Sequence, residues 1–199
     1  MPARGRRPKP KDEIREKLIE HARNIFTKYG FQKSNINEIA LAGGKGKSTL
    51  YYYFDSKEDI FKAVVESELN DFHNNIIDEV NLVVNPQSKI RTYVLTRLNF
   101  LSHYKNLYST IREQSMSRFS YTENIRQKFD NMEVELLTSI LNDGIKDGYF
   151  KINEPALAVT GLISALHGVQ LQFVTSTKKN VFDPTLDNLL EILFFGLIK

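Results

Sequence analysis

Apolar residues recur at intervals of three and four positions along almost the whole chain, and this spacing constrains its fold more than any other feature. In the first such segment the apolar positions are Ile14, Leu18, Ala22, Ile25, Phe26 and Tyr29. We find no run that alternates apolar and polar residues over the length of a strand. The pattern therefore predicts an all-α protein of about nine helices.

Capping and breaking residues set the limits of the predicted helices. Gly30 ends the first helix. Asn35 followed by Glu38 is the pattern of a reciprocal N-terminal cap and starts the second, which the glycines at 43–44 break. A third short helix is expected at 46–54. The later helices are expected at 57–84, 87–103, 105–118, 122–147, 154–177 and 184–198.

Basic residues are concentrated at the start of the chain. Residues 1–57 hold 13 Lys and Arg against 6 Asp and Glu, whereas residues 58–199 hold 14 against 18. A basic front on an acidic remainder indicates that only the front meets a polyanion, although basic tails are often just solubilising. Residues 1–11 contain three prolines and no acidic residue, and predict a disordered basic arm.

The segment 42–54, AGGKGKSTLYYYF, contains the Gly-Lys-Ser-Thr with which a phosphate-binding loop ends. Such a loop also requires a Gly separated by four residues from the Gly-Lys pair, because backbone amides must wrap the phosphates. That position is Leu41, and the segment before it has helical spacing where a buried strand is required. Both differences argue against nucleotide binding here.

Other signatures of catalysis are also incomplete. A nucleophile-elbow pattern has Leu50 at its last Gly position, and a dinucleotide-binding pattern has Thr49 at its last Gly position. The four histidines show no i,i+4 pairing for a metal, and the chain has no cysteine. We therefore expect no catalytic residue, no cofactor and no metal.

A helix that starts near Gly46 has two different sides. Leu50 and Phe54 share one side and can pack on the first two helices. The outward positions hold Lys47, Ser48, Tyr51 and Tyr52. Such a front can read base edges in a major groove and donate to phosphates, and the preceding short helix completes a helix-turn-helix. Because the three tyrosines face three directions, at least one is expected to be structural.

Two flanking segments extend this predicted interface. Lys57 begins the fourth helix and offers a phosphate contact through its side chain and the backbone amides. Arg4, Arg6 and Arg7 of the arm can lie in an adjacent minor groove, which favours arginine. The predicted partner is therefore double-stranded DNA.

Three segments of this region follow the pattern of a known family. They are AxxIFTKYGF at 22–31, SNINEIA at 34–40 and STLYYYFDSKEDIF at 48–61, with Tyr51, Phe54 and Lys57 in a telling Tyr-x-x-Phe-x-x-Lys arrangement. From about residue 14 to residue 61 the chain resembles the DNA-binding domain of the tetracycline-repressor (TetR) family of transcriptional regulators. The resemblance implies a helix-turn-helix domain of three helices at 12–56, joined to a helical ligand-binding and dimerisation domain at 57–199.

The resemblance also implies roles for individual positions. Base-edge contacts are implied for Lys47, Ser48 and Tyr52. Phosphate contacts are implied for Thr49, Tyr51, Tyr53 and Lys57, and more weakly for Ser34 and Asn37.

Three positions depart from the family pattern. Lys45 occupies the place of a small buried apolar residue; its stem can pack while its amine reaches water, where it can add a phosphate contact. Gly46 replaces the usual capping Ser and is an acceptable cap. Ser48 replaces a common Gly, so the base preference cannot be taken from relatives.

The C-terminal part carries two stripes that suit a dimer interface. Small residues recur in the predicted helix 154–177, and leucines form an apolar face on the last helix. The residues are Ala158, Gly161, Ala165, Gly168, Leu186, Leu189, Leu190, Leu193 and Leu197. Two such helices from each of two chains would form a four-helix interface, while the alternative is packing within one chain. The family resemblance favours the homodimer.

An effector pocket is implied among the fifth to eighth helices. Candidates for its wall are Phe100, Tyr104, Tyr108, Phe119, Phe129, His167, Gln170 and Phe173. For each of them, packing in an ordinary core is the simpler interpretation. An aromatic lining with few charges suits an apolar or aromatic small molecule.

The membrane and export alternatives are not favoured. The apolar run at 157–174 carries a His and two Gln, which are costly in hydrocarbon, and is interpreted as a buried helix. No apolar core follows the basic start, so a signal peptide is not expected, and we place the protein in the cytoplasm.

We therefore expect a DNA-binding transcriptional regulator, most simply a repressor. It would bind a palindromic operator as a homodimer and be released by a small, largely apolar effector. Two alternatives remain open. One is a small helical enzyme whose helix-turn-helix is incidental, which measurable turnover or nucleotide binding would reveal. The other is an architectural or RNA-binding protein, which indifference to duplex sequence would reveal.

Overall fold

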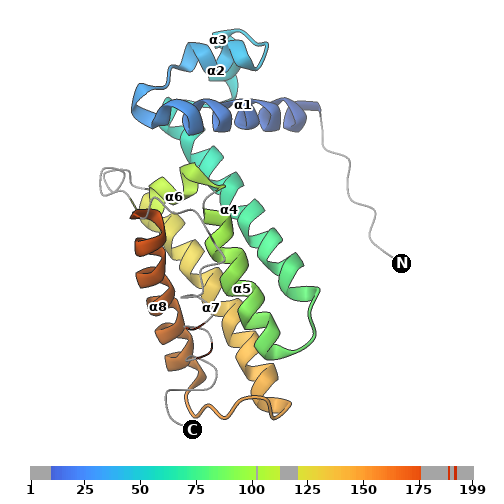
Figure 1. Ribbon diagram of the computed structural model, residues 1–199. Helices are drawn as coiled ribbons and strands as arrows, with labels where there is room; N and C mark the ends of the chain where they lie inside the picture. Colours follow the sequence, from blue (N-terminus) through green and yellow to red (C-terminus); the bar gives the residue numbers. More distant parts are fainter. Residues whose placement is uncertain (1–9, 102, 113–120, 176–187, 189–190, 192–199) are drawn as a thin grey trace. The chain divides into compact units, whose positions relative to one another are not determined.

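Helices make up nearly all of the chain that the structure describes, which is residues 10–101, 103–112, 121–175, 188 and 191 of a computed structural model (Figure 1). No β-strand occurs in these residues. The helices are α1 (Pro10–Lys33), α2 (Ile36–Ala42), α3 (Lys47–Tyr53), α4 (Lys57–Asn81), α5 (Pro86–Leu101), α6 (Lys105–Arg112), α7 (Thr122–Lys146) and α8 (Pro155–Thr175). The predicted all-α class is confirmed.

The helix limits differ from the prediction at several ends, and one predicted helix falls almost wholly outside the described residues. Helix α1 begins at Pro10, so residues 10 and 11 of the predicted arm are helical, and residues 1–9 lie outside the described residues. Proline suits a first turn because its missing N–H has no helical partner there. Helix α4 ends at Asn81 and not at residue 84. The predicted ninth helix, 184–198, lies outside the described residues except for positions 188 and 191.

The chain forms two compact units, which we describe separately. The first comprises residues 1–70 and 104–122, and the second comprises residues 71–103 and 123–199. The boundary at residue 70 lies inside α4, and α6 belongs to the first unit. The first half of α4 contributes Ile60 and Phe61 to the core of the first unit.

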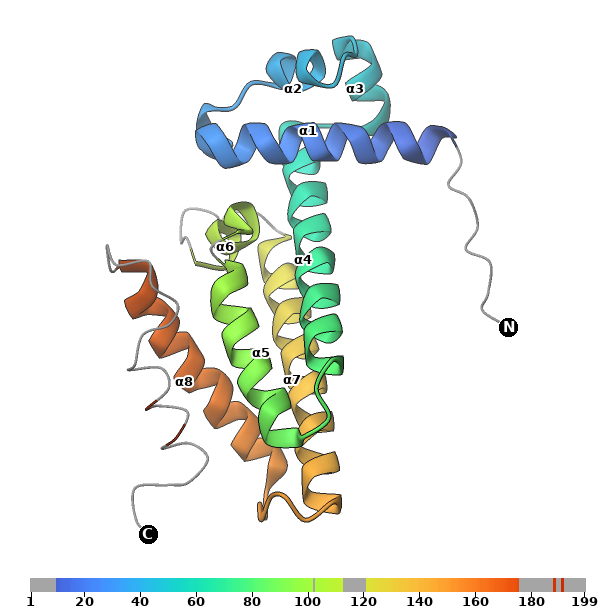
Figure 2. The ribbon, with the colours of Figure 1, turned by 45° about the vertical axis from the view of Figure 1, so that its right-hand side comes forward.

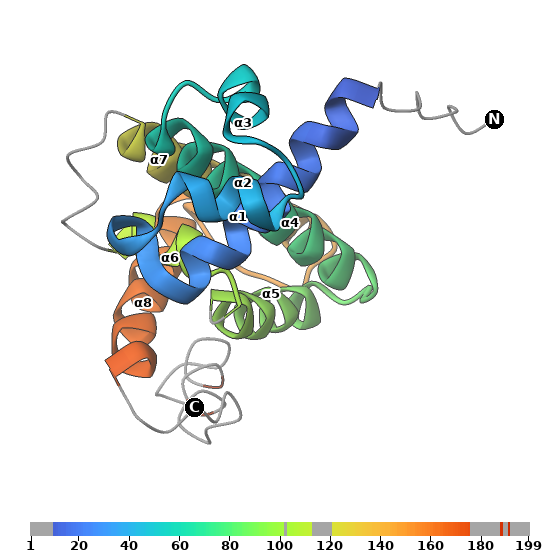
Figure 3. The same cartoon turned by 90° about the horizontal axis from the view of Figure 1, so that it is seen from above.

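The first unit is built on α1. Helix α2 lies against α1, α3 lies against α2, and α6 also contacts α1 (Figure 3). The predicted apolar side of α1 is buried at Leu18, Ala22 and Phe26. The rings of Phe26, Phe31 and Phe61 then form an aromatic cluster, with centroids 5.0 to 6.0 Å apart.

Two glycines shape the turn between α2 and α3. Gly44 has a φ of +61°, a left-handed conformation that glycine adopts without steric cost. Gly43 lies so close to α1 that a Cβ atom at this position would stand 2.9 Å from Cδ2 of Leu18. The predicted break at 43–44 is therefore also a point of close packing between α2 and α1.

A buried carboxylate fixes α6 within the first unit. Glu68 of α4 accepts hydrogen bonds from the backbone N–H of Leu107 and from Nδ2 of Asn106, both at 2.7 Å. Asn106 Nδ2 also donates to Oγ1 of Thr27 on α1 at 2.9 Å. Burial raises the pKa of Glu68 above its ordinary value, although these hydrogen bonds oppose the shift. Glu68 therefore caps the first turn of α6 from another helix.

The second unit contains the end of α4 with α5, α7 and α8. Helices α5 and α7 run lengthwise together with the last turns of α4 (Figures 1 and 2). Their core includes Phe72 stacked on Phe129, with ring centroids 5.3 Å apart. Where α7 ends, the ring of Phe150 lies so close to Gly144 that a Cβ atom at this position would overlap it.

Helix α8 is half exposed. Val159, Leu162 and Leu166 are buried, whereas Leu157 is 65% exposed. The predicted burial of the run 157–174 therefore holds for one side of the helix only, within the residues whose side chains are described. None of the described helices has both the length and the apolar character needed to cross a bilayer.

Candidate nucleic-acid interface

Helix α3 has one buried and one exposed side, as its spacing predicts. Leu50 is 0% exposed. Phe54, the C-cap residue that follows the helix, is 2% exposed. Arg15 of α1 places its guanidinium 5.2 Å from the ring centroid of Phe54, a contact that the sequence did not suggest. Burial of these apolar side chains therefore fixes one side of the helix, and its other side is available to a partner.

The exposed side of α3 carries the three residues predicted to contact bases. Lys47, Ser48 and Tyr52 are all exposed, and Tyr52 is 66% exposed. The ammonium of Lys47 stands 5.6 Å from the ring centroid of Tyr51, which is itself 42% exposed. The structure therefore gathers an ammonium, a hydroxyl and aromatic rings on one short helix, which is a donor-rich surface suited to a nucleic acid.

The remaining α3 residues are partly covered. Thr49 and Tyr53 are half-buried. The rings of Tyr52 and Tyr53 meet edge to face, with centroids 5.1 Å apart. This packing gives Tyr53 a supporting role beside Tyr52, in keeping with the expectation that one tyrosine is structural.

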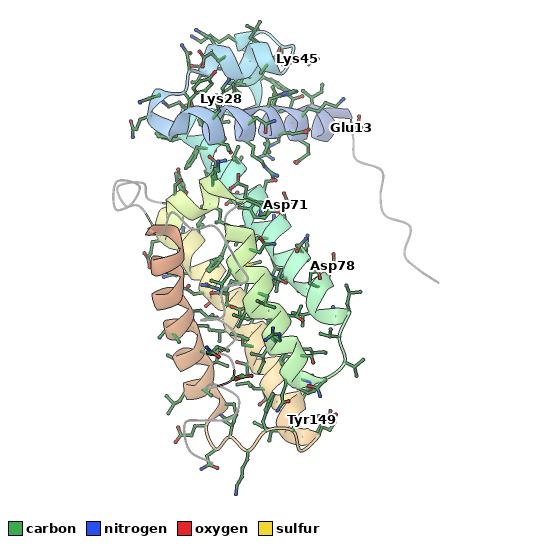
Figure 4. All side chains as sticks on the ribbon, viewed as in Figure 1. Glu13, Lys28, Lys45, Asp71, Asp78 and Tyr149 are labelled. Carbon is green, nitrogen blue, oxygen red and sulfur yellow. The ribbon has the colours of Figure 1, made fainter. Side chains whose placement is uncertain are left out.

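The turn before α3 contains Lys45 and Gly46. Lys45 is exposed, and Figure 4 marks it on the α2–α3 pair. Its backbone N–H donates to the carbonyl of Ala40 at 3.0 Å, so the turn is closed by the backbone. Gly46 caps α3 without a side-chain hydrogen bond.

The residues around the start of α2 have unequal access to a partner. Asn37 is exposed, and its N–H donates to Oδ1 of Asn35 at 2.9 Å, which caps the helix. Ser34 is only 5% exposed, and its hydroxyl donates to the carbonyl of Gly30 at 2.6 Å. Asn37 thus has the access to solvent that a phosphate contact requires. Ser34 instead forms a buried hydrogen bond near the end of α1.

Lys57 lies at the start of α4 with its ammonium turned toward α1. Its Nζ donates to the carbonyls of Phe31, Ser34 and Gln32 at 2.9, 3.1 and 3.4 Å. The sequence predicted a phosphate ligand here, and nothing in the sequence indicated these backbone partners.

The predicted arm and most of the predicted pocket cannot be placed. Arg4, Arg6, Arg7 and Phe119 lie outside the described residues, as do the side chains of Phe100, Tyr108, Gln170 and Phe173. Phe129 is buried in the second unit, where His167 is exposed, and Tyr104 belongs to the first unit. Of the predicted wall residues whose side chains are described, Phe129 and His167 therefore share one unit and Tyr104 lies in the other.

His167 has acidic neighbours in the second unit. A carboxylate oxygen of Asp130, a carboxylate oxygen of Glu133 and a ring nitrogen of His167, which are atoms of the kind that bind metals, lie within 4.8 Å of one another. Partial burial and the nearby Glu133 raise the pKa of Asp130. Glu133 is already bound by Arg97 and by the hydroxyl of Tyr93, so its charge is balanced without a metal ion.

The predicted dimer stripe is partly visible on α8. Gly161 and Ala165 are exposed, with open space where a Cβ of Gly161 would lie, and Ala158 is half-buried. Leu186, Leu189, Leu190, Leu193 and Leu197 lie outside the described residues, as do the surroundings of Gly168.

Comparison with known proteins adds an independent observation. Residues 18–64 match the family model described as bacterial regulatory proteins, tetR family. This segment runs from the middle of α1 into α4 and contains the whole of α2 and α3.

Similar proteins extend the likeness to most of the chain. A crystal structure of a transcriptional regulator from Cytophaga hutchinsonii is 30% identical, with a TM-score of 0.73, over 89% of this chain and 93% of that one. FadR from Bacillus subtilis, in complex with stearoyl-CoA, is 19% identical with a TM-score of 0.73, over 92% and 99% of the two chains. The transcriptional repressor KstR2 of Mycobacterium tuberculosis is 25% identical over 142 residues, or 69% of each chain.

Proposed function

Because this chain belongs to the tetR family of bacterial regulatory proteins, we propose that it binds a specific DNA operator and represses transcription. The observation that carries the proposal is the two-sided α3. Burial of Leu50 and Phe54 fixes the helix, while Lys47, Ser48 and Tyr52 remain exposed on its other side. A helix held in this way can enter a major groove without disturbing the core beneath it.

We further propose that the working form is a homodimer on a palindromic operator. The exposed Gly161 and Ala165 of α8 support close approach of a second helix, because small side chains let backbones come together. A two-fold dimer would read two half-sites about 34–36 Å apart, one helical turn of DNA.

The proposed effector is a small, largely apolar molecule. FadR of Bacillus subtilis was crystallised with stearoyl-CoA, which supports an acyl chain as the class to test first. The helices of the second unit, with Phe129 in their core, are the proposed site. Regulation by such a molecule requires no catalysis, and we place the protein in the cytoplasm with its DNA.

Selection of bound duplexes from a random pool tests the operator proposal. We expect the full-length protein to enrich a palindrome, and its affinity to fall steeply as salt rises because phosphate contacts release counterions. A pool that stays random through repeated rounds, or an affinity that does not respond to salt, would contradict sequence-specific DNA binding.

The effector proposal has its own test on the selected duplex. Stearoyl-CoA and free coenzyme A are added to the complex at equal concentration, and the fraction of bound duplex is measured by fluorescence anisotropy. We expect release by the acylated molecule alone. Equal release by both, or release by neither, would count against an acyl chain as the recognised feature.

A further inference from the structure

We infer that Lys57 is a positioning residue that clasps the two ends of the helix-turn-helix together, and that its ammonium is not a phosphate ligand. The inference rests on the proposed function only for its DNA-binding consequence. The clasp itself is a feature of the folded first unit and can be tested without DNA.

The ammonium of Lys57 is fully engaged within the protein. An ammonium has three N–H donors. Three carbonyls accept from Nζ of Lys57, those of Phe31, Ser34 and Gln32, at 2.9, 3.1 and 3.4 Å. A phosphate could therefore bind this ammonium only by displacing one of these carbonyls.

The surroundings of Lys57 also hold the ammonium in place. Its Nζ stands 4.5 Å from the ring centroid of Phe31. That ring belongs to the cluster with Phe26 and Phe61, at centroid distances of 6.0 and 5.0 Å. A cation over a buried aromatic face gains further attraction, because the face of the ring carries partial negative charge.

The need for a clasp follows from how α1 ends. Gly30 leaves the helical conformation, with φ +75° and ψ +162°, so the carbonyls after it lack regular helical partners. Ser34 satisfies the carbonyl of Gly30 through its hydroxyl. Lys57 satisfies the next carbonyls with a positive charge, which is the sign that a helix C-terminus favours.

The contacts of Lys57 connect the two chain segments that flank α2 and α3. Its three acceptors lie 26, 25 and 23 residues earlier, and α2 and α3 occupy the chain between them. The ammonium thus links residues 31–34, which precede α2, to Lys57, which follows α3. Without the ammonium, the α2–α3 pair would lose this polar link to the end of α1, and we expect α3 to be presented less rigidly.

The test compares Lys57→Met, which keeps the stem and removes the ammonium, with Lys45→Met at an exposed lysine in the same region. We expect Lys57→Met to accelerate hydrogen–deuterium exchange in residues 30–42 at least tenfold, and Lys45→Met to leave it unchanged. Lys57→Gln retains two N–H donors without charge and should fall between Lys57→Met and the wild type. The graded order keeps the test decisive even if Lys57→Met folds poorly.

DNA binding gives the second readout, on the duplex that the wild-type protein enriches most. Lys57→Met should weaken binding while the slope of log affinity against log salt stays that of the wild type. Loss of a phosphate contact would instead reduce the slope by about 0.9 for each contact. Val94→Ala, a core change in the second unit, shows what reduced stability alone does to binding.

Each outcome decides the matter. Faster exchange with an unchanged salt slope supports the clasp. A reduced slope for Lys57→Met, or exchange that matches the wild type, would overturn it. If the wild-type protein enriches no duplex, the proposed function fails, and the exchange measurement still tests the clasp on its own.

Discussion

Arg97 and Glu133 form an ion pair between α5 and α7 that is closed to solvent, with side-chain exposures of 0% and 3%. The hydroxyl of Tyr93 donates to the same carboxylate at 2.5 Å. Burial and the charge of Glu133 raise the pKa of Tyr93 well above its ordinary value, so this phenol stays protonated and remains a donor. The three side chains thus satisfy one another in an otherwise apolar core.

Removal of one partner from this group should be costly. Glu133→Gln leaves the charge of Arg97 buried without its counter-ion, and we expect a loss of about 3–5 kcal/mol in the free energy of unfolding, measured with urea. The combined variant Tyr93→Phe, Arg97→Met and Glu133→Leu removes the charges together and should recover most of that loss. Glu135→Gln, on the exposed part of α7, is the matched control. A single-variant loss no larger than that of the control would refute a buried pair.

The glycines of the α2–α3 turn should respond in opposite directions. Gly46→Ser should stabilise the protein by about 0.5–1 kcal/mol, because the hydroxyl can cap α3 and the unfolded chain loses freedom. There is room for the change, since a Cβ at Gly46 meets only Oγ of Ser48, at 3.7 Å. Gly44→Ala should cost about 1–2 kcal/mol because its φ is +61°. Thermal unfolding of both variants checks the signs.

Lys47 should contribute to sequence preference. Lys47→Ala removes an exposed ammonium from the front of α3, and the absence of its hydrogen bond to a base edge should cost about 1–3 kcal/mol at one position of the operator. Repeating the duplex selection with the variant shows whether preference relaxes there. An unchanged consensus bound with unchanged affinity would falsify the base-reading role.

Tyr51 should act on affinity and leave preference alone. Tyr51→Phe removes the hydroxyl proposed to reach a phosphate but keeps the ring that Lys47 approaches at 5.6 Å. We expect weaker binding to every duplex by a similar factor, measured by anisotropy on the selected site and on scrambled duplexes. A loss confined to the selected site would mean that Tyr51 reads bases.

Glu68 should make stability depend on pH in a stated direction. Its pKa is raised in the folded protein, mainly by burial, above the ordinary value of 4.5. The stability it provides is therefore fully present below the unfolded pKa and is lost as pH rises through the folded pKa. The unfolding free energy of the wild type minus that of Glu68→Gln should fall as pH rises from about 4 to about 8, because only the wild type loses a stabilising proton. A difference that grows over this range would reverse the assignment.

Sequence spacing was sufficient to predict helices throughout the described residues and the two sides of α3. Leu50 and Phe54 are four residues apart, and local periodicity alone places them on the buried side. Gly44 likewise indicated its turn, since glycine is the residue that takes a positive φ freely. These features depend on neighbours within a few positions, which is the range that a single sequence reports.

The polar contacts across the fold could not be predicted in the same way. The carbonyls that Lys57 binds have no side-chain signature, and they lie at least 23 residues away. Glu133 did leave a signal, because it falls between Phe129 and Leu137 in a stripe with a spacing of four. A carboxylate in such a stripe indicates a buried partner without identifying it, and Arg97 is 36 residues distant.

The capping of α6 by Glu68 bears on how this protein can be dissected. The first unit is discontinuous in sequence, because residues 71–103 belong to the second unit. Asn106 bonds to Thr27, which lies 79 residues earlier in the chain. A recombinant fragment cut at residue 64, the end of the family match, would lack both α6 and the Glu68 carboxylate that caps it. The smallest fragment expected to fold around α3 is therefore not a simple amino-terminal fragment. A minimal version would also need residues 104–112, joined to it by a linker.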